Sequence, residues 1–99
     1  MLNSYTKSKL ADRDISHIVM RSLEDFGEQQ TDKYMNGLEE ILNFLADNPN
    51  RGRVFTHDTT KRSYFFYRYI SHVVYYRQRK NDIFITRILH SKMLPEKHL

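Results

Sequence analysis

The stretch Arg62–His90, RSYFFYRYISHVVYYRQRKNDIFITRILH, decides the fold because aromatic and β-branched residues dominate it. Such residues favour extended strands, and the stretch divides into expected strands at residues 64–70, 71–79 and 83–90. The polar tripeptide Lys80-Asn81-Asp82 between the last two is typical of a tight hairpin turn. We therefore expect three consecutive strands in a largely antiparallel sheet.

Two amphipathic helices are expected before these strands. The apolar stripe of the first comprises Ala11, Ile15, Ile18, Val19, Leu23 and Phe26, and that of the second comprises Tyr34, Leu38, Ile41, Leu42 and Leu45. Ser8 is a candidate N-cap, and Gly27 is well placed to end the first helix in a left-handed conformation. Asn48-Pro49 ends the second helix, because the residue before a proline avoids the α conformation. Two helices joined by so short a turn should form an antiparallel hairpin.

The remaining segments complete the expected order. Residues 2–7 read as a first strand, and residues 51–61 as a polar loop. Gly37 costs its helix about 1 kcal/mol relative to alanine, so we expect the backbone there to approach the first helix or the sheet closely. Pro95 limits any helix in the tail to a turn or two. The order β-α-α-β-β-β predicts one α+β domain over residues 1–99, with the helical hairpin packed on the sheet.

Composition excludes several kinds of site. The chain has no cysteine, only three scattered glycines and five scattered histidines, so we expect no disulfide, no phosphate-binding loop, no metal and no cofactor. No apolar run reaches the ~18 residues of a membrane span, and the chain start lacks a signal-peptide pattern, which predicts a cytoplasmic protein without a membrane partner.

The two halves of the chain carry opposite charge. Residues 1–50 hold five Lys and Arg against nine Asp and Glu, a net charge of −4. Residues 51–99 hold eleven against three, a net charge of +8. A charge of this size in one half steers a protein toward an acidic partner or a nucleic acid, although solvated helix faces and sheet edges also carry charge.

Several segments, in order, resemble one toxin family. They are Leu10–Ile15, Phe26–Gln30 with Tyr34, Leu45–Pro49 with Gly52-Arg53, Ser71–Arg77, and Thr86–Met93 with Lys97–Leu99. Together they are similar to the ParE branch of the RelE/ParE superfamily over essentially the whole chain. The resemblance implies a RelE/ParE-like fold and a toxin that inhibits DNA gyrase, through its A subunit, by binding and without catalysis. It also implies neutralisation by a ParD-type antitoxin and no direct nucleic-acid binding without partners.

Two alternatives stay open. A ribosome-dependent mRNA endoribonuclease of the RelE type needs cationic and proton-transferring side chains, for which Arg68, Arg77, Arg87, His72 and His90 are the candidates. Against it, the last strand ends in His90-Ser91 where several such ribonucleases place a tyrosine, and no carboxylate lies between Asp58 and Asp82. A nucleic-acid-binding module could use the aromatic residues 64–76 for stacking, but a chain without tryptophan needs these rings in its core.

Two sets of contact residues are expected. The target-binding set is Arg87, His90, Lys92, Met93 and Leu94, and the antitoxin-binding set is Ile15, Val19, Tyr34, Leu38, Arg68 and Arg77. Strand alternation places His90 on a face with Phe84, Thr86 and Ile88, and Arg87 on the other with Ile83, Ile85 and Leu89. The structural alternatives are that His90 bonds the tail backbone, that Arg87 anchors the tail, and that Met93, Leu94 and Leu99 cover the sheet edge.

Overall fold

Five strands form one sheet in the computed structural model, which describes residues 4–99. They are β1 (Tyr5–Lys7), β2 (Arg53–Thr56), β3 (Ser63–Tyr69), β4 (His72–Gln78) and β5 (Ile83–His90), in the spatial order β1-β5-β4-β3-β2. β1 runs parallel to β5, and every other neighbouring pair is antiparallel. The three strands predicted from the aromatic stretch are confirmed, while part of the expected first strand lies outside the described residues.

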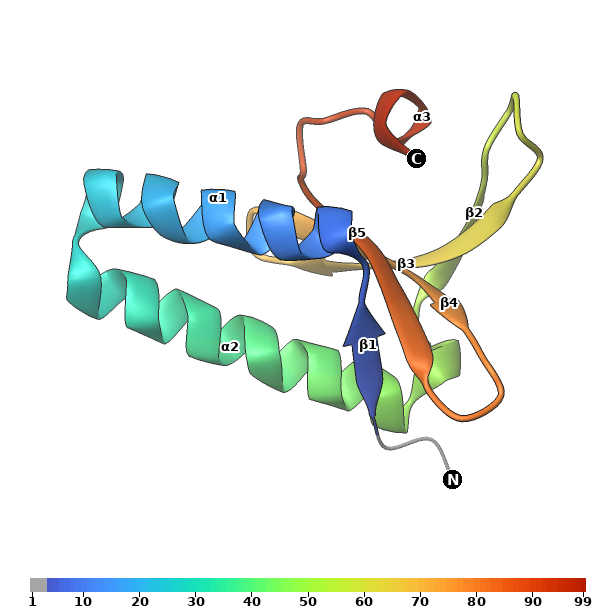
Figure 1. Ribbon diagram of the computed structural model, residues 1–99, viewed down its shortest axis with the longest axis horizontal. Helices are drawn as coiled ribbons and strands as arrows, with labels where there is room; N and C mark the ends of the chain where they lie inside the picture. The colour runs from blue at the N-terminus through green and yellow to red at the C-terminus, as the bar shows by residue number, and fades with distance from the viewer. Residues whose placement is uncertain (1–3) are drawn as a thin grey trace.

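Two long helices pack on one face of the sheet as an antiparallel hairpin (Figure 1). They are α1 (Lys9–Phe26) and α2 (Glu28–Asp47), followed by the short 3₁₀ helix η1 (Pro49–Arg51) and, in the tail, α3 (Pro95–His98). The Ser8 side chain accepts a 2.9 Å hydrogen bond from the Ala11 amide, which confirms the predicted N-cap. Gly27 separates the helices with φ of 84° and ψ of 177°, a conformation with positive φ but outside the left-handed helical region. None of the described helices is long and apolar enough to cross a membrane.

The prediction of a polar loop over residues 51–61 is wrong, because β2 lies within it. Arg53 pairs with Phe66, and the pairing continues to Thr56 opposite Ser63. A four-residue strand at the sheet edge has too few positions to show an alternating pattern. Its extended conformation depends on hydrogen bonds to β3, which a local reading of the sequence does not contain.

A bulge in β5 overturns the predicted faces of that strand. Tyr75 pairs with Arg87, whereas the next residue, Tyr76, pairs with Ile85, so Thr86 is an extra residue. An extra residue moves every later side chain to the opposite face. Consequently Ile88 joins the same core as Ile83 and Ile85, and His90 shares its face. Arg87 and Leu89 lie on the other face, with Phe84.

The core lies between the helical hairpin and the sheet. Its buried residues are Ala11, Ile18, Leu38, Leu42, Leu45, Ala46, Val74, Tyr76, Ile83, Ile85 and Ile88. A Cβ at Gly37 would collide with the hydroxyl of Tyr69, which donates a 2.9 Å hydrogen bond to the Tyr34 carbonyl. The close approach predicted at Gly37 is thus confirmed, and its partner is a side chain of β3.

The tail returns across the face of the sheet that the helices leave open. Buried His57 accepts hydrogen bonds at Nδ1 from the amides of Thr59 and Thr60, so its Nε2 is a donor and bonds the Glu96 carbonyl at 2.9 Å. Tyr64, Tyr75 and Leu89 are also buried and lie outside the main core cluster. The aromatic block therefore serves the interior of the protein on both faces of the sheet.

Candidate functional site

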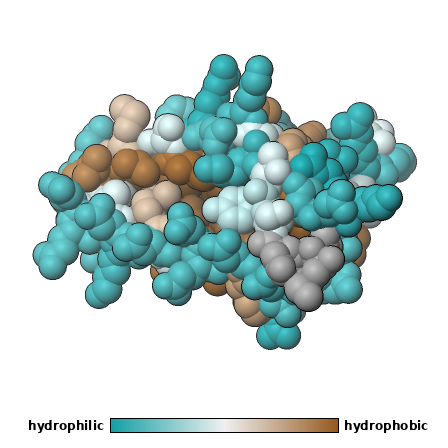
Figure 2. All heavy atoms as spheres, turned by 60° about the horizontal axis from the view of Figure 1, so that its bottom comes forward, coloured by the Kyte–Doolittle hydropathy of each residue, from teal (hydrophilic) through white to brown (hydrophobic). Residues whose placement is uncertain are grey.

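A groove lined by both apolar and polar side chains lies between α1, α2 and β1. It has a volume of about 170 Å³ and is lined by Tyr5, Lys7, Ile15, Met35, Asn36, Leu38, Glu39 and Leu42. Leu38 is only 1% exposed and forms part of the floor, whereas Ile15 is half-buried on one wall. Figure 2 shows the apolar surface as a brown strip that runs along the helical hairpin. Two residues of the predicted antitoxin-binding set therefore line one groove.

The apolar surface continues toward the tip of the hairpin, which projects beyond the strands (Figure 1). Half-buried Val19 lies one helical turn beyond Ile15, and Leu23 follows one turn later. Phe26 is 70% exposed at the tip. Leu23 and Phe26 were predicted on the core stripe, but no strand lies under this end of α1. An exposed apolar strip of this kind is typical of a protein-binding surface.

Arg68 and Arg77, the cationic members of the predicted antitoxin-binding set, lie on the opposite face of the sheet. The Nε of Arg68 donates a 2.8 Å hydrogen bond to the carbonyl of Ile70. The guanidinium of Arg77 lies 5.2 Å from the ring centre of Phe84, its neighbour on β5. The set thus divides between two faces, and of its members only Ile15 and Leu38 line the groove.

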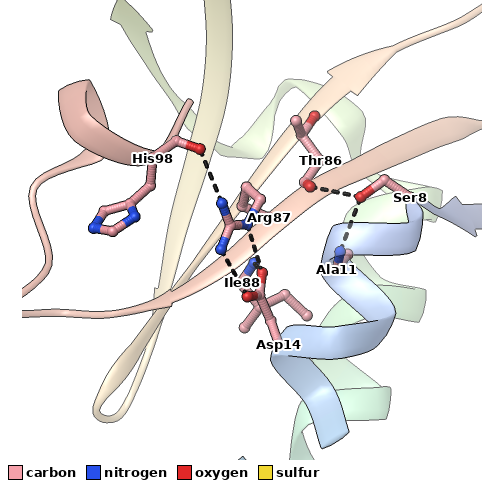
Figure 3. A network of polar contacts seen from close by, with 7 residues as sticks. All are labelled: Ser8, Ala11, Asp14, Thr86, Arg87, Ile88 and His98. Atoms are coloured by element: carbon pink, nitrogen blue, oxygen red, sulfur yellow. Dashed lines mark hydrogen bonds and ion pairs between the residues drawn. The ribbon is translucent and has the colours of Figure 1, made fainter. Parts of the chain in front are cut away.

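Arg87 joins β5, α1 and the tail (Figure 3). Its guanidinium forms a bidentate ion pair with Asp14, with both N–O distances 2.9 Å, and donates a further 2.9 Å hydrogen bond to the His98 carbonyl. Asp14 also accepts a hydrogen bond from the Ile88 amide. The hydrogen bonding of Arg87 to the Asp14 carboxylate, which accepts, raises the pKa of Arg87. The donors of this arginine are therefore engaged inside the protein, and the structural alternative of a tail anchor describes its contacts.

The tail is fastened at its two ends and exposed between them. At the start, the Lys92 amide donates to Nδ1 of His90, and the Met93 amide donates to the His90 carbonyl. At the end, His57 and Arg87 hold the backbone of α3. Between these points Lys92 is exposed, Met93 is 37% exposed and Leu94 is 59% exposed. Three residues of the predicted target-binding set consequently form one accessible segment.

His72 and His90 pair across β4 and β5, with ring centres 5.4 Å apart. Nδ1 of His72 lies 2.7 Å from the hydroxyl of Tyr34, which belongs to α2. The pKa of His72 is lowered to about 4, chiefly by burial and also by the neighbouring His90, while Asp14 acts in the opposite direction. His72 is therefore neutral near pH 7, and Tyr34 holds the helical hairpin against the end of the sheet.

A family model described as the ParE toxin of the type II toxin-antitoxin system parDE matches residues 5–95. The chain belongs to the ParE toxin family. Among solved structures, a chain of the chromosomal ParDE toxin–antitoxin system from P. aeruginosa is similar, with a TM-score of 0.70 and 17% sequence identity. The alignment covers 90% of this chain and 96% of that one, and at this identity it shows the shared fold. No curated protein sequence matches the chain.

In this ParE toxin, His72 and His90 lie together, but the three arginines considered with them for ribonuclease chemistry are not shown in contact with this pair. Arg68 and Arg77 lie on the open face of the sheet, whereas half-buried His72 contacts α2 on the helical face. Arg87 is held in its ion pair with Asp14. Within residues 4–99 no three His, Asp or Glu side chains are grouped so as to hold a metal ion.

Sequence reasoning missed several residues that line the groove of this ParE toxin. Met35 and Glu39 are four residues apart on α2, and their position beside the apolar stripe was open to inference from helical spacing. Tyr5 and Lys7 had no such signal. They reach the groove because β1 pairs with β5, a strand some 80 residues later in the chain.

Proposed function

We propose that this ParE toxin binds DNA gyrase, through its A subunit, and inhibits it without chemistry of its own. The family match over residues 5–95 carries this proposal. The structure supports it with accessible contact surfaces and with candidate catalytic side chains that are dispersed over two faces of the sheet. Gyrase acts on DNA in the cytoplasm, so the toxin would act there as well.

The target-binding surface is proposed to be the exposed tail segment Lys92–Leu94 together with His90. Fastening the segment at both ends limits its conformations, which lowers the entropy lost when it binds. Methionine and leucine supply apolar contact, and lysine supplies charge for an acidic surface. Arg87 contributes by holding the tail in position.

A ParD-type antitoxin is the proposed partner of the groove between α1, α2 and β1. An amphipathic helix or extended segment laid along the hairpin would cover Ile15, Val19 and the floor at Leu38. Such a segment could bury the side of Tyr34 that remains accessible. Because Arg68 and Arg77 lie on the opposite face, an antitoxin that also contacts them must pass around an edge of the sheet.

Two reactions with the purified toxin test the proposal. We expect inhibition of gyrase supercoiling and no cleavage of mRNA on programmed ribosomes. The His72→Ala variant should retain the inhibition wherever it folds, since a binding toxin needs no proton transfer. If the toxin instead cleaves mRNA, and His72→Ala lowers the cleavage about 100-fold or more, the RelE-type ribonuclease is the correct function.

A further inference from the structure

The turn between β3 and β4 has an unusual residue at its tip. Tyr69 pairs with His72, so Ile70 and Ser71 form a two-residue hairpin turn. Ile70, at the first central position, has φ of 51°. Glycine, asparagine or aspartate usually occupies this position, because a side chain at positive φ collides with the backbone and a β-branched one collides most.

Burial does not compensate for the strain at Ile70, whose side chain is 62% exposed. Within residues 4–99 the other non-glycine residue with positive φ is Lys61, with φ of 63°. Lysine is unbranched at Cβ and hydrophilic, so it fits an exposed turn more easily than isoleucine does. Ile70 is thus both conformationally strained and apolar in a position where neither property helps the fold.

Hydrogen bonds from three parts of the molecule hold the turn in place. Nε of Arg68 donates to the Ile70 carbonyl at 2.8 Å, and the Ser91 amide donates to the Ser71 carbonyl at 2.8 Å. The Ser71 amide is 3.4 Å from the hydroxyl of Tyr34 on α2. Strain that is fixed by its surroundings in this way often marks a binding position.

The turn lies beside the exposed tail segment. The bond from Ser91 to Ser71 brings the start of the tail against the turn, and His90 pairs with His72 at its base. Arg68 bonds the Ile70 carbonyl, and Lys92 follows Ser91 in the chain, whereas Glu40 of α2 acts electrostatically on Tyr69, the residue before Ile70. The turn therefore presents an exposed aliphatic side chain next to the cationic side chain of Arg68.

We propose that Ile70 is a contact residue for the toxin's target, inserting its side chain into an apolar hollow on a protein that has an acidic group opposite Arg68. This inference rests on the proposed function insofar as the toxin acts by binding a protein, and it extends the contact surface from the tail to the β3–β4 turn. A nucleic-acid partner is not favoured, because an aliphatic side chain offers no ring on which a base can stack.

The test compares Ile70→Asn with Val54→Asn in the full-length toxin. Val54 is a suitable control because it is also β-branched and 62% exposed, but it lies on the edge strand β2. Asparagine tolerates positive φ, so Ile70→Asn should melt no lower than the wild type. We expect this variant to lose at least about ten-fold in growth arrest and in gyrase inhibition, a typical loss at a central contact, while it still binds the antitoxin. Val54→Asn should retain its potency.

Each outcome decides one of the two proposals. An Ile70→Asn variant that arrests growth as well as the wild type, or that loses the antitoxin and keeps its toxicity, overturns the role of Ile70. A wild-type toxin that arrests growth without affecting supercoiling overturns the gyrase proposal. In that case growth arrest by the two variants still decides whether Ile70 contacts the target.

Discussion

Replacing Asp14 with asparagine should destabilise this toxin far more than the same change at Asp12, two residues earlier on α1. The asparagine oxygen can still accept the hydrogen bonds from the Ile88 amide and from Nε of Arg87, so the change removes the charge opposite Arg87 together with the hydrogen bond from Nη2. The side chains of Arg87 and Asp14 are only 15% and 11% exposed. In the Asp14→Asn variant, the largely buried guanidinium of Arg87 would have neither hydration nor a carboxylate to balance its charge.

The magnitude follows from this burial. Removing one partner of a buried ion pair costs about 3–5 kcal/mol, and the residual exposure favours the lower end, about 3 kcal/mol. A chain of this length has a total stability of roughly 5–15 kcal/mol, so the loss is a large fraction of it. At about 4–8 °C per kcal/mol, the melting temperature should fall by about 12–24 °C.

Asp12→Asn is the matched control. Asp12 forms a 3.3 Å ion pair with Lys7, but its side chain is 59% exposed, and surface pairs of this kind contribute about 0–1 kcal/mol. Urea unfolding monitored by circular dichroism measures the free energy of unfolding of both variants. If the two lie within about 1 kcal/mol of each other, the ion pair between Asp14 and Arg87 does not stabilise the fold as described.

Three further predictions concern the tail, the histidine pair and the charge asymmetry. Leu94→Ser should weaken gyrase inhibition about ten-fold without changing the melting temperature, whereas Val54→Ser, at a position of similar exposure, should leave the inhibition unchanged. If both variants inhibit gyrase equally well, the tail is not part of the target-binding surface. The folded pKa of His72, about 4, lies below its unfolded value of 6.5, so unfolded chains take up the proton first as pH falls. The stability that His72 contributes is therefore complete above pH ~6.5 and lost toward pH ~4. The free energy of unfolding should consequently fall less steeply with decreasing pH for His72→Ala than for the wild type. Parallel curves for the two proteins would contradict this. The association rate with an acidic antitoxin segment, followed by stopped-flow fluorescence, should fall steeply from low to physiological salt, while the dissociation rate changes little. A constant association rate would mean that the +8 charge of residues 51–99 does not steer binding.

The sequence by itself determined the elements whose signals are local. Helical spacing located both helices, Ser8 marked the start of α1, and Asn48-Pro49 marked the end of α2. The dense aromatic and β-branched residues located β3, β4 and β5, with the turn at Lys80-Asn81-Asp82 between the last two. Each of these signals depends only on the conformational preferences of a residue and its near neighbours, so it can be read from the sequence alone.

Only the tertiary structure decided the rest. β2 exists because β3 offers it hydrogen bonds, and the bulge at Thr86 exists because β4 and β5 pair on both sides of it. The bulge sends His90 to the helical face and Arg87 to the open one. Arg87 then bonds the tail and, in α1, Asp14, which is 73 residues earlier in the chain. Ile70 gives no sign in the sequence of its positive φ. Pairing between distant segments sets register, faces and strain, and no local preference encodes it.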